Sequence, residues 1–202
     1  MINVRMILRN GLVFPLLLVT GVCILFGCNT KETYKRELER RGIAYSVESF
    51  HNIVGAGYKD MTELFLKAGM NINAGGPSGD TALMVAAVTG NIEMLKFLIQ
   101  KGADVNAKNI YGYTATMYTA SIGNTEVLKI LIKNKADINA RNNDGETALM
   151  LAALNDQIGS VKFLIEEGAD INIKNNVGKT ALEYAFLNTQ IADLLRQATI
   201  NK

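Results

Sequence analysis

The side chains most often used in catalysis are few in this chain, and they do not stand together. The single histidine is His51, and the two cysteines, Cys23 and Cys28, both lie near the N-terminus. A nucleophile needs a neighbouring base, and a metal site needs a cluster of ligands. We therefore expect no catalytic centre, no metal site and no cofactor, and we interpret His51 as a surface or end-cap residue.

Three aspartates and three methionines recur at one fixed interval, as structural residues do in a repeat. We expect the aspartates to accept hydrogen bonds from nearby backbone N–H groups in a loop, and the methionines to pack in the core. The glycine-rich stretch 75–79 lacks the GK[ST] sequence that follows a phosphate-binding loop. The recurring residues are Asp104, Asp137, Asp170, Met84, Met117 and Met150. None of these patterns indicates catalysis, and the chain is predicted not to be an enzyme.

A short phrase that begins with glycine sets the period of the chain. It reads GDTAL, GYTAT, GETAL and GKTAL, and it starts at Gly79, Gly112, Gly145 and Gly178. The threonine of each phrase is a favourable helix N-cap. Apolar residues at helical spacing follow it, most clearly in LMVAAVTGNIEMLKFLI at residues 83–99. The sequence predicts an all-α chain whose unit is a turn, a short helix, a turn, a longer helix and a loop.

The spacing between successive glycines resembles the repeat length of the ankyrin-repeat family, and the TAL phrase resembles the signature of that family. The resemblance covers roughly residues 43–197 and implies a solenoid of helix-turn-helix units joined by β-turn or hairpin loops. The expected repeat domain, 43–202, divides into a degenerate N-terminal cap at 43–75, three regular units at 76–108, 109–141 and 142–174, and a truncated C-terminal cap at 175–202. Atypical end units are what an open-ended solenoid needs.

Two residues depart from the pattern of the neighbouring units. Lys135 stands where the adjacent units have Gly102 and Gly168, and Thr116 stands where they have leucine. A residue other than glycine is strained at a helix end if its φ is positive. We expect the third unit, 109–141, to be the least well packed.

The resemblance further implies that a partner protein binds to a concave face formed by the turn tips and the first helices. Positions that the fold does not fix differ between units, and they are the candidate contacts: Pro77, Ser78, Asp80, Ile110, Tyr111, Tyr113, Tyr118, Asn143, Asp144, Glu146, Asn176, Val177 and Lys179. The third unit gathers apolar and aromatic residues at its tip, a composition typical of interfaces. The alternative is that these side chains pack against neighbouring turns and compensate for Thr116.

The N-terminal segment 1–27 has the order of a secretory signal. Arg5 and Arg9 precede an uncharged run at residues 12–27, which is shorter than the roughly 20 residues that a spanning helix needs. The run ends in LFGC, which resembles a bacterial lipoprotein signal and implies that Cys28 is lipidated. The alternative is an uncleaved signal anchor. Either reading places the domain outside the cytoplasmic membrane, at its periplasmic face or at the cell surface.

Residues 28–42 are predicted to be a charged, solvated spacer helix that ends at Gly42. Beyond Arg5 and Arg9 the chain has as many acidic as basic side chains, because 21 Lys and Arg less these two equals the 19 Asp and Glu. This balance argues against nucleic-acid binding.

We therefore expect a non-catalytic protein-protein interaction module, monomeric in its folded domain and anchored by lipid in a bacterial cell envelope. Two alternatives are an architectural envelope protein without a specific partner and an accessory or inhibitor of an envelope enzyme.

Overall fold

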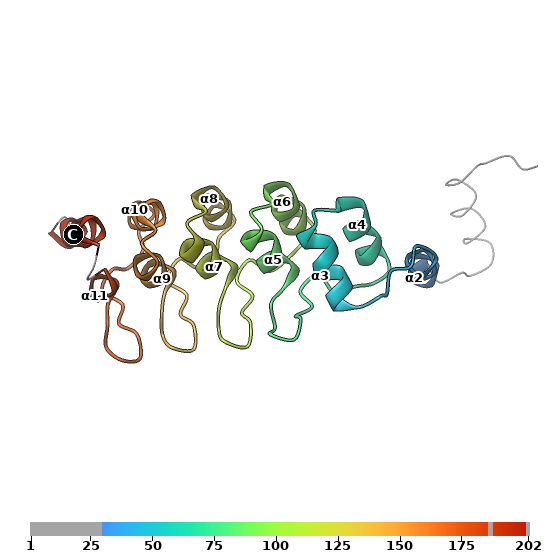
Figure 1. Ribbon diagram of the computed structural model, residues 1–202, viewed down its shortest axis with the longest axis horizontal. Helices are drawn as coiled ribbons and strands as arrows, with labels where there is room; N and C mark the ends of the chain where they lie inside the picture. Colours follow the sequence, from blue (N-terminus) through green and yellow to red (C-terminus); the bar gives the residue numbers. More distant parts are fainter. Residues whose placement is uncertain (1–29, 186–187, 201–202) are drawn as a thin grey trace, which may run out of the picture.

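The computed structural model describes residues 30–185 and 188–200, so the predicted signal segment and Cys28 lie outside the described residues. The described part consists of helices and loops without a strand, and the expected all-α repeat solenoid is confirmed. Five helix pairs stack side by side, with one further helix at the N-terminal end (Figure 1). The helices are α2 (Thr30–Arg40), α3 (Val47–Gly55), α4 (Lys59–Lys67), α5 (Ala82–Val88), α6 (Ile92–Gln100), α7 (Ala115–Ile122), α8 (Thr125–Lys133), α9 (Ala148–Leu154), α10 (Ile158–Glu166), α11 (Ala181–Tyr184) and α12 (Thr189–Ile200).

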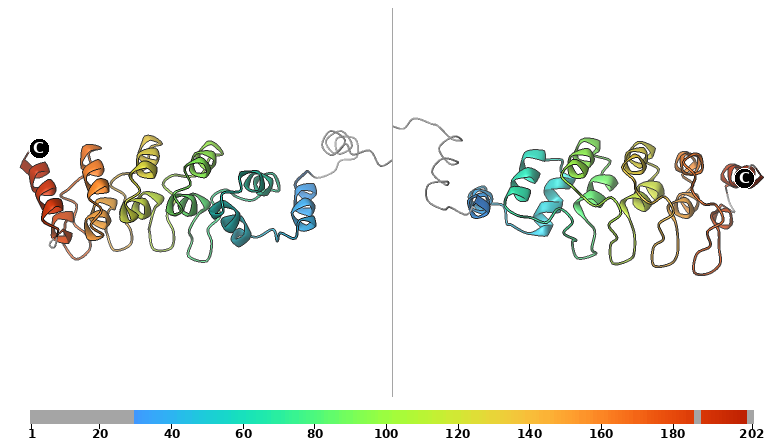
Figure 2. Two further views of the ribbon diagram at one scale, coloured as in Figure 1. Left: turned by 45° about the horizontal axis from the view of Figure 1, so that its top comes forward. Right: turned by 180° about the vertical axis from the view of Figure 1, so that it is seen from behind.

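The helix pairs and their loops form three layers. The first helices of the pairs, α3, α5, α7, α9 and α11, form one row, and the second helices form another row above it (Figure 1). Long loops project from the row of first helices, and this arrangement is equally clear from behind (Figure 2). Each loop tip directly precedes a first helix, so tips and first helices lie close together along the stack.

Three of the four predicted threonine N-caps make the expected side-chain hydrogen bond, whereas at Thr180 the Glu183 carboxylate accepts from the Thr180 N–H instead. Thr114 Oγ1 accepts a hydrogen bond from the backbone N–H of Met117 at 3.3 Å, and Thr81 and Thr147 cap α5 and α9 in the same way. Each cap satisfies one backbone donor that the first helical turn would otherwise leave without a partner. The helix starts are therefore fixed by the repeated phrase itself.

Apolar side chains from both helix rows are buried along the length of the stack. In the degenerate first unit, Phe50 and Phe65 are fully buried at the positions equivalent to leucines in the next unit. Met84, Met117 and Met150 are at most 2% exposed, which confirms that they pack in the core. A continuous core built from neighbour contacts is the way in which a solenoid is stabilised.

The helix that was predicted to be a solvated spacer is instead the end helix of the stack. α2 packs against α4, with Leu38 fully buried and Tyr34 against the same apolar cluster. Tyr34 and Leu38 are four residues apart and share one face of the helix. Glu37 of α2 binds both Arg40, the last residue of the helix, and Arg41, which follows it. The helix ends just before Gly42, which has a φ of +71°, as predicted.

The loop aspartates make the expected local hydrogen bonds. Asp104 Oδ1 accepts from the backbone N–H of Asn106 at 2.8 Å, and Asp137 and Asp170 do the same in their units. Their own N–H groups donate to an asparagine of the preceding unit, at 2.9 Å between Asp104 and Asn73. These aspartates shape and link the loops.

Lys135 has a φ of +66°, in the left-handed region that Gly102 and Gly168 occupy in the neighbouring units. The structure adds Asp156, with a φ of +56°, at the position equivalent to Gly123. We expect Lys135→Gly to raise the free energy of unfolding by about 1 kcal/mol, because the Cβ strain is removed. Asp156→Gly should raise the free energy of unfolding by less, since aspartate tolerates the left-handed region better than lysine does.

Thermal unfolding of both variants tests this prediction, and a gain of about 1 kcal/mol corresponds to about 2–4 °C in Tm. A Tm of Lys135→Gly that equals or falls below that of the wild type would contradict it.

Thr116 is 1% exposed, and its hydroxyl has no hydrogen-bond partner. A buried hydroxyl without a partner costs about 1–3 kcal/mol. We expect Thr116→Val, which keeps the shape of the side chain, to stabilise the protein by about 1 kcal/mol. Urea denaturation of this variant beside Thr119→Val checks the cause. Thr119 is also buried, but its hydroxyl donates to the Ala115 carbonyl at 2.8 Å. Equal changes in the free energy of unfolding on the two substitutions would contradict the cost assigned to the unpaired Thr116 hydroxyl.

Candidate functional site

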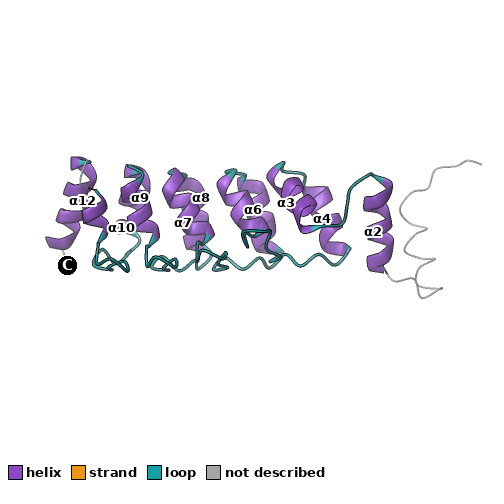
Figure 3. Cartoon of the chain, turned by 60° about the horizontal axis from the view of Figure 1, so that its bottom comes forward, coloured by secondary structure: helices purple, strands orange, loops and turns teal. Residues whose placement is uncertain are grey.

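The loop tips are joined to one another by backbone hydrogen bonds. The N–H of Asn143 donates to the carbonyl of Tyr111 at 3.0 Å, and the N–H of Asn176 donates to the carbonyl of Asp144 at 2.9 Å. The N–H of Ile110 likewise donates to Ser78 at 3.1 Å. Figure 3 shows the loops gathered along one edge of the stack. Because the tips are linked in series, they form one row with a fixed order.

Side chains of two tip asparagines add to this row. Asn143 Nδ2 donates to the Ile110 carbonyl at 2.9 Å, and Asn176 Nδ2 donates to the Asn143 carbonyl at 2.8 Å. Both residues were predicted as candidate contacts. The structure gives them a role in holding neighbouring tips together.

A buried asparagine holds the tips of the third, fourth and fifth units from inside. Asn109 is 6% exposed, and its Oδ1 accepts from the backbone N–H groups of Tyr111 at 3.0 Å and Tyr113 at 2.9 Å. Asn142 and Asn175 make the equivalent pairs of bonds. These asparagines were not among the residues predicted from the sequence, although they recur with the same period as the glycines and could be recognised by it.

Tyrosines of the first helices connect one unit to the tip of the unit before it. Tyr118 on α7 donates to Asp80 at 3.2 Å, and Tyr184 on α11 donates to Glu146 at 2.7 Å. Burial, followed by the hydrogen bond to Glu146, raises the pKa of Tyr184 to about 12. Burial and the nearby Asp80 carboxylate also raise the pKa of Tyr118. These links position the acidic tips against the first helices.

The candidate contacts divide into exposed and half-buried groups. Val177, Ile110 and Tyr111 are the most exposed apolar ones, at 75%, 60% and 57%. Pro77, Asn143, Asp144, Asn176 and Lys179 are also exposed, whereas Ser78, Asp80, Tyr113, Tyr118 and Glu146 are half-buried. The rings of Tyr113 and Tyr118 pack together with centroids 5.3 Å apart. The alternative to partner binding, in which the side chains of the third unit pack within the protein, therefore applies to Tyr113 and Tyr118. The side chains of Ile110 and Tyr111 face solvent.

The structure adds a second set of exposed apolar residues. Val88, Ile122 and Leu154 lie at the C-terminal ends of α5, α7 and α9 and are 47–48% exposed. Ile122 is one helical turn beyond Tyr118 and so lies on the side of α7 that faces the loops. Val88 and Leu154 are two repeat periods apart and occupy the same place in their units. The shared position of Val88 and Leu154 in the repeat was therefore the feature of the sequence from which they could have been predicted. Tips and helix ends together outline one partly apolar face, which also carries the carboxylates of Asp80, Asp144 and Glu146.

His51 has a structural environment. Its Nε2 lies 3.1 Å from the carbonyl oxygen of Ala74, and its side chain is half-buried beside Phe50. Burial lowers the pKa of His51, although the Ala74 carbonyl and the Asp80 carboxylate oppose this shift. Within residues 30–185 and 188–200, no group of three His, Cys, Asp or Glu side chains could hold a metal ion. No helix of this part is long and apolar enough to cross a bilayer.

A family model described as ankyrin repeats (3 copies) matches residues 22–109 and 117–202. The matched segments cover most of the chain and leave out 110–116, which holds the apolar tip of the third unit and Thr116. No curated protein matches this sequence.

Proposed function

We propose, from the premise that this chain belongs to the ankyrin-repeat family, that it is a non-catalytic module that binds a partner protein. Ankyrin repeats generally mediate protein-protein interactions, and proteins built from them are typically non-catalytic. The contact face would consist of the row of loop tips and the exposed ends of α5, α7 and α9.

The exposed apolar tip of the third unit carries this proposal. The backbone at Tyr111 is fixed by the buried Asn109 and by the Asn143 N–H, while the tyrosine side chain remains 57% exposed. A rigid aromatic side chain is an effective contact anchor, and a fixed backbone lowers the entropy lost on binding. Ile110 beside it adds apolar area that water would otherwise solvate at a cost.

We also propose that Cys28 carries a lipid that anchors the domain in a bacterial cell envelope. The lipoprotein-like LFGC sequence supports this assignment. α2 begins at Thr30, and it is packed onto the repeats, so an anchor at Cys28 would hold the whole solenoid close to a bilayer. Labelled palmitate should be incorporated into the wild type and not into Cys28→Ser.

Affinity capture from detergent-solubilised envelope tests partner binding. The bait is the full chain, compared with Ile110→Ser/Tyr111→Ser. Tyr113 is left unchanged, because its ring packs against Tyr118. The control variant is Tyr58→Ser, which replaces a 63% exposed tyrosine of the first unit.

We expect a protein that is captured by the wild type and by Tyr58→Ser to be lost with the double variant, at an unchanged melting temperature. Equal capture by all three baits would exclude the third-unit tip as the contact. Capture by none of them would favour an architectural role.

A further inference from the structure

We propose that the partner presents a basic segment that carries apolar side chains, and that this segment lies across the tips of the third, fourth and fifth units. The proposal rests on the proposed function and names the chemistry of the partner. It follows from the distribution of charge over the molecule, from the neutral partners of the acidic side chains, and from the order of the tips.

Charge is unevenly divided between the two helix rows. The tips and first helices of the second to fifth units comprise residues 76–90, 110–123, 143–156 and 176–185. They contain one basic residue, Lys179, against five acids: Asp80, Asp144, Glu146, Asp156 and Glu183. The chain from residue 28 onward has equal numbers of acids and bases, so the remaining surface is net basic. Arg141, just before the fourth tip, also lies in the row of tips, because its guanidinium donates to the Gly145 carbonyl and to Asn176 Oδ1. With Arg141 included, acids still outnumber bases by five to two on the face that is proposed to bind.

Neutral groups bind these carboxylates within the described structure. Asp80 accepts from Asn109 and Tyr118, and Glu146 accepts from Asn142 and Tyr184. The ion pairs between described residues lie instead on α2 and on the second helices.

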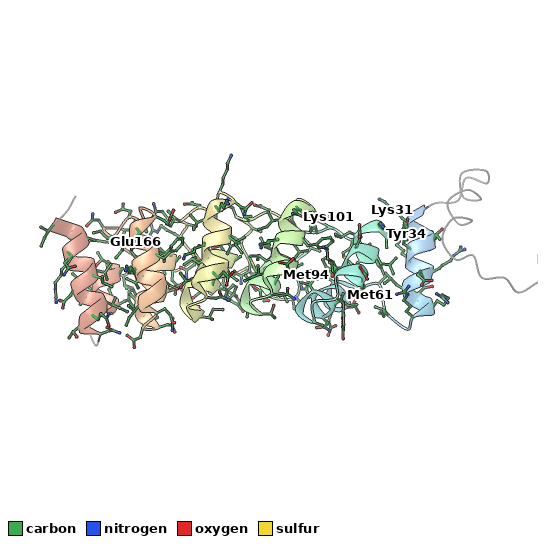
Figure 4. All side chains as sticks on the ribbon, turned by 90° about the horizontal axis from the view of Figure 1, so that it is seen from above. Lys31, Tyr34, Met61, Met94, Lys101 and Glu166 are labelled. Carbon is green, nitrogen blue, oxygen red and sulfur yellow. The ribbon has the colours of Figure 1, made fainter. Side chains whose placement is uncertain are left out.

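Figure 4 looks onto the row of second helices, where Lys101 binds Glu63 at 3.0 Å and Glu166 lies near Lys162. Charges on that face are largely compensated. The Asp80 and Glu146 carboxylates of the contact face are held in place by neutral hydrogen-bond donors and not by ion pairs, an arrangement that attracts cations.

The order of the tips adds a spatial pattern. Tyr111 supplies an apolar contact in the third unit, Asp144 supplies an exposed carboxylate in the fourth, and Val177 supplies an apolar contact in the fifth. Hydrogen bonds between the tips hold these three side chains in sequence. A complementary segment presents an apolar, a basic and an apolar side chain in the same order.

Selection from a library of short random peptides displayed on phage tests this chemistry. The target is the full chain in a non-ionic detergent, and selected peptides are then synthesised and titrated by fluorescence anisotropy. Two neutralising variants are compared with the wild type. Asp144→Asn removes the exposed carboxylate of the fourth tip, and Glu166→Gln removes an exposed carboxylate from α10 on the other face.

We expect the selected peptides to be enriched in Lys or Arg together with large apolar residues. Their Kd should rise with salt. It should also rise about 2- to 5-fold in Asp144→Asn, as for an exposed ion pair, and stay unchanged in Glu166→Gln.

Selected peptides without basic enrichment, a Kd that is insensitive to salt, or equal effects of the two variants would each overturn the proposal. If envelope capture still depended on Ile110 and Tyr111, the partner-binding function would stand and only the basic character of the partner would be rejected.

Discussion

Asn109→Ala is expected to lower the free energy of unfolding by about 3 kcal/mol. The Asn109 side chain accepts from two backbone N–H groups, those of Tyr111 and Tyr113, and its Nδ2 donates to Asp80 at 2.8 Å and to Tyr118 at 2.9 Å. Alanine leaves two tip donors without their acceptor and removes the link to the preceding unit. The apolar tip of the third unit would lose its fixed shape together with this stability.

Urea denaturation followed by circular dichroism measures the effect. The matched control is Asn106→Ala in the same loop. Asn106 is exposed, and its side chain makes two hydrogen bonds, to the Asp137 N–H at 2.8 Å and to the Lys135 carbonyl at 3.2 Å. Asn106→Ala should lower the free energy of unfolding by about 1 kcal/mol. Equal losses in the two variants would contradict the central role of the buried asparagine.

Gly112→Ala is expected to destabilise the protein by about 3 kcal/mol, and Gly178→Ala by only about 1 kcal/mol. Both glycines have nearly the same φ, +78° and +81°. A Cβ on Gly112 would lie 2.6 Å from Asn143 Oδ1 and 2.7 Å from Asn143 N, whereas a Cβ on Gly178 would meet nothing within 4 Å.

The pair of variants separates two effects. Both suffer the backbone strain of a left-handed residue, and only Gly112→Ala forces apart the tips of the third and fourth units. The difference in the free energy of unfolding therefore measures how closely the tips stack. If Gly178→Ala cost as much as Gly112→Ala, strain alone would account for both.

The local architecture was accessible from the sequence because each feature is repeated. The threonine caps, the helix-ending glycines and the buried methionines all recur with one period, and the strained φ of Lys135 follows from its glycine neighbours in the same register. Asp156 was open to the same reasoning, since Gly123 stands one period before it.

Contacts between units were less accessible. Tyr118 and Asp80 are 38 residues apart, and so are Tyr184 and Glu146. Their pairing depends on how one unit stacks on the next, and local periodicity does not specify that geometry. α2 was misjudged for a related reason, because its buried face consists of Tyr34 and Leu38 within an otherwise charged helix.

The candidate contact positions were found as a group because they vary between units. Exposure then separates those with a structural partner, such as Tyr118, from those whose side chains face solvent, such as Tyr111. Sequence variation alone cannot make this distinction, since it marks residues that link tips as readily as residues that await a partner.

Photo-crosslinking in cells tests the central claim most directly, by placing p-benzoylphenylalanine at position 111 of the full chain and, in a second variant, at position 166 on α10. Both side chains are exposed, but Tyr111 lies at a loop tip and Glu166 lies on α10 in the row of second helices. We predict a discrete crosslinked protein from position 111 and none from position 166. A crosslink from position 166 alone, or from neither position, would contradict partner binding at the loop tips.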